Sequence, residues 1–203
     1  MVYVILILAG LLLVFLLLVW LRKVQFDAVH RNLLDLVDHY GGKVIRGGFA
    51  VRPRYSGTYK DLPLTVNISA ERKTKNSPRQ FYISVFLKAA SAINFTVMSN
   101  VWLGERDHSK TGKIFTRQIF NKEYVVEVAE KKFLKMLNFE KLESFVKRLH
   151  PFAYTLVSRN GLIFERLSQN LIKDTEFEVL DRTLLALYDL TTTITGDLTK
   201  KSS

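Results

Sequence analysis

The most uniform stretch of the chain is an apolar run at its N-terminus. Val2 to Leu21 contains no charged side chain and no hydroxyl group except that of Tyr3. At about 1.5 Å per residue, such a run forms a helix of about 30 Å, which matches the hydrocarbon core of a bilayer. Helices of soluble proteins do not stay apolar on every face over this length. The pattern therefore predicts that Val2 to Leu21 crosses the lipid bilayer.

A cleaved secretory signal is the competing interpretation of this run. Such a signal has basic residues ahead of an apolar segment of about 7 to 15 residues, and small residues at the cleavage site. Here nothing basic precedes the run, the run is longer, and Trp20, Leu21, Arg22 and Lys23 stand where small residues are needed. We therefore expect residues 1–23 to remain in the protein as a transmembrane anchor.

Lysine and arginine gather on one side of the anchor. None precedes the apolar run, whereas Arg22, Lys23, Arg31, Lys43 and Arg46 follow it closely. Because cytoplasmic flanks carry the excess of these residues, the body is expected in the cytoplasm and the N-terminus outside. Export of a large domain regardless of charge stays an alternative. The absence of cysteine fits both orientations.

A helical period follows the anchor. From Phe26 to Tyr40, apolar residues recur at spacings of three and four, which is the stripe of an amphipathic helix. Gly41 and Gly42 then provide an end for this helix. No proline or glycine lies between Leu11 and Tyr40, so the anchor and the second helix are able to form a single rod.

From Lys43 to about Val128 the period changes from helical to two. Leu64, Val66 and Ile68 alternate with polar residues, and the same alternation returns in later segments. This pattern predicts antiparallel strands with one covered face. The strands are expected around residues 64–71, at Phe81–Leu87 and Ile93–Val97, and also at Lys43–Ile45, Phe49–Tyr59, Ile114–Phe120 and Tyr124–Val128.

The C-terminal part combines two helices with a hairpin. The spacing predicts a helix over Ala129–Leu149, and Pro151 prevents it from continuing. A last helix is expected from Thr175, whose spacing to Glu178 matches a capping box, to about Thr195. The hairpin is expected between them, with strands at Phe152–Val157 and Leu162–Leu167 and a turn at Asn160 and Gly161.

This order of elements predicts an α+β fold. An N-terminal transmembrane helix is followed by a mainly antiparallel sheet packed with about three helices. We divide the chain into a transmembrane anchor (1–23), a single α+β domain (24–198) and a polar tail (199–203). A folded part of this size is able to form a core without disulfides or metal.

Candidate metal ligands occur on the helix after the anchor. Asp35, Asp38 and His39 share a helical face, and His30 lies close by in the sequence. They lie opposite much of the apolar stripe, where charged side chains are normally solvated, and neither cysteine nor a His-x-x-x-His spacing completes a ligand set. We expect neither a metal nor a cofactor.

Catalytic motifs are absent from the sequence. The chain has no cysteine nucleophile and no Gly-x-Ser-x-Gly segment. Its glycine pairs are not followed by Gly-Lys-Ser/Thr, the motif that ends a phosphate loop. A site can still assemble from residues far apart in the chain. A membrane-tethered enzyme of that kind therefore stays an alternative to a protein without catalytic activity.

Positive charge is the strongest bulk property, with a formal net charge of +11. A body held near an anionic leaflet gains from such charge. Nucleic acid would also be attracted, but no recognisable nucleic-acid-binding frame accompanies the charge, which argues against it. We predict a non-enzymatic binding or scaffolding module that engages anionic lipid headgroups or membrane protein partners. The predicted contact residues lie in one loop: Arg72, Lys73, Lys75 and Arg79.

Overall fold

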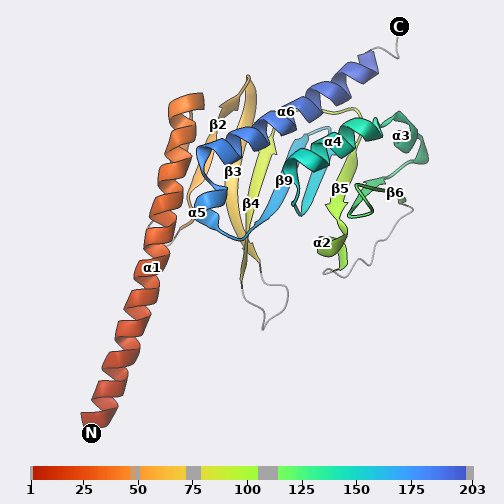
Figure 1. Cartoon of the computed structure of the whole chain (residues 1–203). Coiled ribbons are helices and arrows are strands. Elements are labelled where there is room, and N and C mark those ends of the chain that lie inside the picture. The colour runs from red at the N-terminus through yellow and green to blue at the C-terminus, as the bar shows by residue number, and fades with distance from the viewer. Residues whose placement is uncertain (1, 47, 49–50, 72–78, 105–113, 200–203) are drawn as a thin grey trace.

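One continuous helix forms the N-terminal part of the chain. The computed structural model describes residues 2–46, 48, 51–71, 79–104 and 114–199. Helix α1 runs unbroken from Val2 to Tyr40, so the single rod that the sequence allows is formed. Figure 1 shows that its N-terminal half projects beyond the body. Among the described residues, α1 is the one helix long and apolar enough to cross a membrane.

The body is built on one antiparallel sheet, to which the described residues contribute nine strands. Their order is β1-β2-β3-β4-β9-β8-β5-β7-β6, so the late hairpin β8-β9 lies between β4 and β5. With the long N-terminal helix and several further helices, this confirms the predicted α+β fold. The strands are β1 (Lys43–Ile45), β2 (Arg54–Tyr59), β3 (Leu62–Glu71), β4 (Gln80–Leu87), β5 (Phe95–Ser99), β6 (Phe115–Ile119), β7 (Tyr124–Val128), β8 (Tyr154–Ser158) and β9 (Gly161–Ser168).

The longer helices cover one face of this sheet. In Figure 1, α6 and α4 cross the near face of the strands, and α1 stands beside the sheet at the β1-β2 side. Alternate strand residues such as Val66, Val85 and Phe164 are buried beneath them. Besides α1, the described helices are α2 (Asn100–Gly104), α3 (Lys131–Met136), α4 (Phe139–Leu149), α5 (Leu171–Asp174) and α6 (Phe177–Thr199).

The C-terminal half of α1 belongs to the hydrophobic core. Phe26, Val29, Leu33 and Leu36 are completely buried, and three of these four join the main core cluster. Burial of one such side chain contributes about 1.5 to 3 kcal/mol. The same helix therefore serves as the candidate membrane segment and as a core element of the body.

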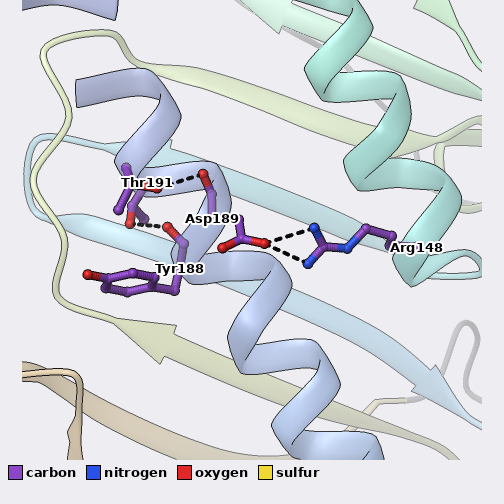
Figure 2. Close-up of polar contacts among 5 residues, drawn as sticks. Arg148, Tyr188, Asp189 and Thr191 are labelled. Carbon is purple, nitrogen blue, oxygen red and sulfur yellow. Dashed lines mark hydrogen bonds and ion pairs between the residues drawn. The ribbon is translucent and has the colours of Figure 1, made fainter. Parts of the chain in front are cut away.

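An ion pair joins α4 to α6 on the outside of the helical layer. Both terminal nitrogens of Arg148 contact Asp189 Oδ2, at 2.8 and 2.9 Å (Figure 2). The hydroxyl of Thr191 donates to the carbonyl oxygen of Tyr188 within α6. Because Arg148 and Asp189 are both largely exposed, their pairing is expected to contribute only about 0.2 to 1 kcal/mol. Apolar packing therefore dominates the contact between α4 and α6.

The helix predicted over Ala129–Leu149 is two helices in the structure. Leu137 takes an extended conformation (ψ 134°) between α3 and α4. The side chain of Asn138 then accepts a hydrogen bond from the backbone nitrogen of Lys141 at 3.1 Å. Asparagine competes with the helix through such local bonds, and here it caps a new helix.

The predicted capping box at Thr175 is also wrong. Helix α6 begins at Phe177, and Thr175 ends the short helix α5 instead. Its hydroxyl donates to the carbonyl oxygen of Leu171 at 2.7 Å and accepts from the side chain of Asn32 at 3.1 Å. Thr175 therefore ties α5 to α1, a long-range role that its spacing to Glu178 does not reveal.

Candidate functional site

Two aromatic contacts define which end of the sheet faces the anchor. Phe26 packs edge-on against Phe81 at the start of β4, with ring centroids 6.4 Å apart. Tyr40 packs against Tyr59 at the end of β2, at 5.1 Å. Because Phe26 is closer to the apolar run, the sheet has a membrane-proximal end at Phe81 and a membrane-distal end at Tyr59. Figure 1 shows α2 toward the membrane-proximal end.

A pocket of about 520 Å³ lies at the membrane-proximal end. The first residues of β4 and β7, the last residues of β9 and β5, and helix α2 contribute to it. Its volume lies in the range of small-molecule sites, which are mostly apolar with a few polar groups. The lining includes Tyr82, Trp102, Tyr124, Phe152 and Leu167, together with the polar residues Lys122, Glu123 and His150.

Helix α2 forms one wall of this pocket and was not predicted from the sequence. It follows β5 directly and carries Val101, which is 74% exposed, next to Trp102. The Trp102 ring lies 5.1 Å from that of Tyr154 on β8. An exposed valine beside a tryptophan places apolar surface at the mouth of the pocket.

The turn between β6 and β7 supports α2 from the side. The backbone nitrogen of Asn100 donates to the carbonyl oxygen of Glu123 at 2.8 Å, and its side chain bonds to the carbonyl oxygen of Lys122. Phe120, Asn121 and Lys122 all have positive φ angles, between 49° and 66°. Non-glycine residues adopt this conformation at a cost, and such strain gathers at functional sites. Besides the pocket, the strained turn is thus a second indication of a functional site at this end of the sheet.

The polar groups at the floor of the pocket are already engaged with one another. The Tyr124 hydroxyl accepts from the backbone nitrogen of Phe152 and lies 3.1 Å from His150 Nδ1. Glu123 Oε2 lies 3.7 Å from the same nitrogen. Burial raises the pKa of Tyr124, so this hydroxyl keeps its proton at neutral pH. The contacts of Tyr124 with His150 and Phe152 therefore hold the segment after α4 against the strands.

A half-buried arginine, Arg166, supports the floor from the helical side of the sheet. Arg166 Nη2 donates to the carbonyl oxygen of Leu149 at the end of α4, at 2.8 Å. Its guanidinium also lies 6.0 Å from the centroid of the Phe164 ring, and burial lowers its pKa. A cation at a helix C-terminus satisfies an otherwise unpaired carbonyl group. Arg166 thus fixes the point where α4 leads into the pocket.

The residues predicted to contact lipid or partners are only partly covered by the structure. Arg72, Lys73 and Lys75 lie outside the described residues. Arg79 is described, and it is exposed directly before β4, at the membrane-proximal end. It lies close to Arg52, whose pKa is lowered by burial and by the charges of Arg22 and Arg79. This association is not apparent from the sequence, because the three arginines come from separate segments.

One of the candidate metal ligands on α1, His39, has other partners. His39 Nδ1 donates to the carbonyl oxygen of Asp35 at 2.8 Å, and its ring stacks on Phe177 at 3.9 Å. In the part of the chain that the structure describes, no group of three or more His, Asp or Glu side chains is arranged to hold a metal. His39 therefore has a packing role at the end of α1.

Comparison with known proteins identifies a fold but no family. The sequence matches no protein-family model and no curated protein. In fold, the chain is similar to the crystal structure of the mycobacterial trehalose monomycolate transport factor A, TtfA. The TM-score is 0.53 at 7% sequence identity, and the match covers 81% of this chain and 93% of that one. At this identity the likeness establishes a shared fold alone.

Proposed function

We propose that the chain is a single-pass, non-enzymatic membrane protein whose cytoplasmic body binds lipid at the membrane-proximal end of its sheet. The observation that carries the proposal is one of position. The pocket under α2 lies at the end of the sheet that faces the apolar half of α1. If α1 stands across the bilayer as a straight rod, this end of the body faces the membrane surface.

The chemistry of the pocket favours the alkyl chain of a membrane lipid as its occupant. The walls carry aromatic and aliphatic groups, and Val101 adds an exposed apolar side chain at the mouth. Moving apolar surface from water into such a pocket contributes about 25 cal/mol per Å². The fold is shared with a protein named as a transport factor for trehalose monomycolate. That likeness transfers no substrate, but it is a reason to test lipids first.

An enzyme assembled from distant residues is the alternative function. The pocket does bring together Glu123, Tyr124 and His150 from separate segments. A general base or acid works best with a pKa near the operating pH. The pKa of Tyr124 is instead raised by burial, and its hydroxyl is held by Phe152 and His150. These features favour binding over catalysis.

The basic loop is a further part of the proposal. Arg72, Lys73, Lys75 and Arg79 precede β4 in the chain, and β4 starts at the membrane-proximal end. They therefore stay candidate contacts for anionic headgroups or a membrane protein partner. Each basic residue near an anionic surface contributes on the order of 1 kcal/mol within a Debye length.

The cytoplasmic orientation is tested by protease treatment of intact cells or spheroplasts. We expect the body to resist digestion until the membrane is permeabilised, because the basic flank of the anchor starts at Arg22 and Lys23. An antibody against the C-terminus measures the surviving protein, and a known cytoplasmic protein controls for lysis. Digestion of the body from outside in sealed cells would overturn the orientation and leave the anchor in place.

Lipid binding in the pocket is tested by photolabelling the full-length protein in nanodiscs. The probe is a phosphatidylcholine with a diazirine near the end of one acyl chain. We expect crosslinks at α2 and the end of β9. Leu167→Asp and Leu167→Trp should each lower this labelling by about tenfold or more, because one variant charges the wall and the other fills the space.

A matched variant separates this effect from general damage. Leu185 on α6 is 40% exposed and outside the pocket lining, so Leu185→Asp should leave the labelling unchanged. Circular dichroism and the thermal midpoint show whether each variant is folded. Crosslinks spread over the body, or equal labelling of the wild type and both folded Leu167 variants, would exclude the pocket as the lipid site.

A further inference from the structure

Two arginine side chains lie against one aromatic pair where α1 leaves the apolar run, and a third arginine lies near one of them. The Arg22 guanidinium carbon lies 5.4 Å from the centroid of the Phe26 ring, and that of Arg52 lies 5.9 Å from the Phe81 ring. The two rings meet edge-on at 6.4 Å. Arg79 precedes β4 by one residue and is close enough to influence Arg52 electrostatically. We call Arg22, Arg52 and Arg79 the arginine cluster.

No carboxylate among the described residues pairs with the arginine cluster. Among the described residues, no ion pair links Arg22, Arg52 or Arg79 to an acidic side chain, and Asp27 is paired with Arg46 at 2.5 Å. The Nε atom of Arg52 is buried and has no hydrogen-bond partner in the described part of the protein. Burial and the charges of Arg22 and Arg79 lower the pKa of Arg52.

Buried polar atoms normally have partners, and like charges normally repel, so this arrangement calls for an anion. A phosphate group fits the arginine cluster best, because planar guanidinium groups bind phosphate oxygens through two parallel hydrogen bonds. Phe26 and Phe81 restrict the movement of two of the guanidinium groups. A group held in this way loses less conformational freedom on binding a ligand.

The position of the arginine cluster identifies the source of the phosphate. Arg22 comes directly after Leu21, the last residue of the apolar run, and Trp20 lies beside it. Tryptophan at the end of a membrane helix marks the headgroup level. We infer that Arg22, Arg52 and Arg79 form a binding site for the phosphate group of an anionic membrane lipid. The inference rests on the membrane-spanning role of α1 in the proposed function, but not on the pocket.

The test uses the full-length protein in nanodiscs that contain phosphatidylcholine and phosphatidylglycerol. Native mass spectrometry measures how much of each lipid stays bound after release. We expect Arg52→Gln and Arg79→Gln to lower retained phosphatidylglycerol by about tenfold each, because each removes a charged phosphate contact. Retained phosphatidylcholine should fall much less, because its choline group neutralises the charge of its phosphate. Arg79 is exposed, so its variant tests the site even where Arg52→Gln impairs folding.

Arg159→Gln is the matched control, since Arg159 is exposed in the turn between β8 and β9 at the membrane-distal end. It removes the same charge and should leave phosphatidylglycerol retention unchanged. An equal loss of phosphatidylglycerol in this variant would mean that overall charge explains the effect. It would exclude a specific lipid site at the arginine cluster. Displacement of the lipid by soluble glycerol phosphate would assign the site to free phosphate esters and overturn the membrane source.

The two proposals fail in different ways. If the Leu167 variants lose acyl-chain labelling but retain as much phosphatidylglycerol as the wild type, the pocket and the arginine cluster are two separate sites. If the acyl-chain probe never labels the pocket while the arginine variants still lose phosphatidylglycerol, the pocket proposal fails and the arginine cluster stands. If folded Arg52→Gln and Arg79→Gln proteins both keep phosphatidylglycerol, the arginine cluster is not a lipid site, whatever the labelling shows.

Discussion

Leu33→Asp is expected to unfold the body while the anchor stays in the membrane. Leu33 is 0% exposed in the core formed by α1 and the sheet. The variant removes an apolar side chain and buries an unpaired charge, which together are expected to lower the free energy of unfolding by more than about 4 kcal/mol. A domain of this kind is stable by only about 5 to 15 kcal/mol. Protease resistance of the full-length protein over a urea series measures the loss.

The neighbouring residue provides the control for this experiment. Leu34 is 40% exposed on the same turn of α1, so Leu34→Asp introduces the same charge one position away at the surface. Its effect should stay within about 0.5 kcal/mol. Equal resistance of the two variants to urea would contradict the packing of α1 against the sheet, and with it the rigid connection between anchor and body.

The rod and the sheet were predictable because they depend on local pattern. The uninterrupted helix follows from the absence of proline and glycine between Leu11 and Tyr40, and the strands around Val66 and Val85 follow from a period of two. The turn at Asn160 and Gly161 was predicted for the same reason, and Ser158 does pair with Gly161. Each of these features is decided by residues within a few positions of one another.

The strand order was not predictable, because it depends on contacts between distant segments. Hairpin β8-β9 lies between β4 and β5, so Leu167 pairs with Tyr82 across a large sequence separation. This pairing creates one wall of the pocket, and α2 closes another with Trp102. No periodicity links these three residues. A pocket that exists only through such pairings leaves no motif in the sequence.

The sequence also shows only part of the basic surface that the fold creates. Charge density along the chain indicated the loop that contains Arg72, Lys73 and Lys75, whose contact role stays a prediction. The same density cannot reveal that Arg22 and Arg79 both lie within electrostatic reach of Arg52, since only the fold brings the three segments together. The charge pattern therefore predicts an anionic ligand at the membrane surface, which stays a prediction, but it does not include Arg22 and Arg52 among the contacts.

The way the body lies along α1 depends on the corner between α1 and β1. Tyr55 donates from its hydroxyl to the carbonyl oxygen of Gly41 at 2.8 Å, and Lys43 at the start of β1 pairs with Ser56 on β2. Gly41 and Gly42 both have positive φ angles, 70° and 91°. A left-handed conformation in a residue other than glycine costs about 1 to 2 kcal/mol. The two glycines therefore let the rod turn sharply into the sheet.

Gly42→Ala is consequently expected to be far more damaging than Gly41→Ala. A Cβ atom at Gly42 would lie 2.5 Å from the carbonyl oxygen of Ser56 and 2.6 Å from the Cα atom of Gly57, whereas one at Gly41 meets nothing within 4 Å. Gly41→Ala should lower the free energy of unfolding by about 1 to 2 kcal/mol. The backbone clash adds about 1 to 3 kcal/mol in Gly42→Ala. Urea unfolding of the full-length proteins in detergent measures both, and equal midpoints would contradict the close approach of the Gly42 backbone to β2 at this corner.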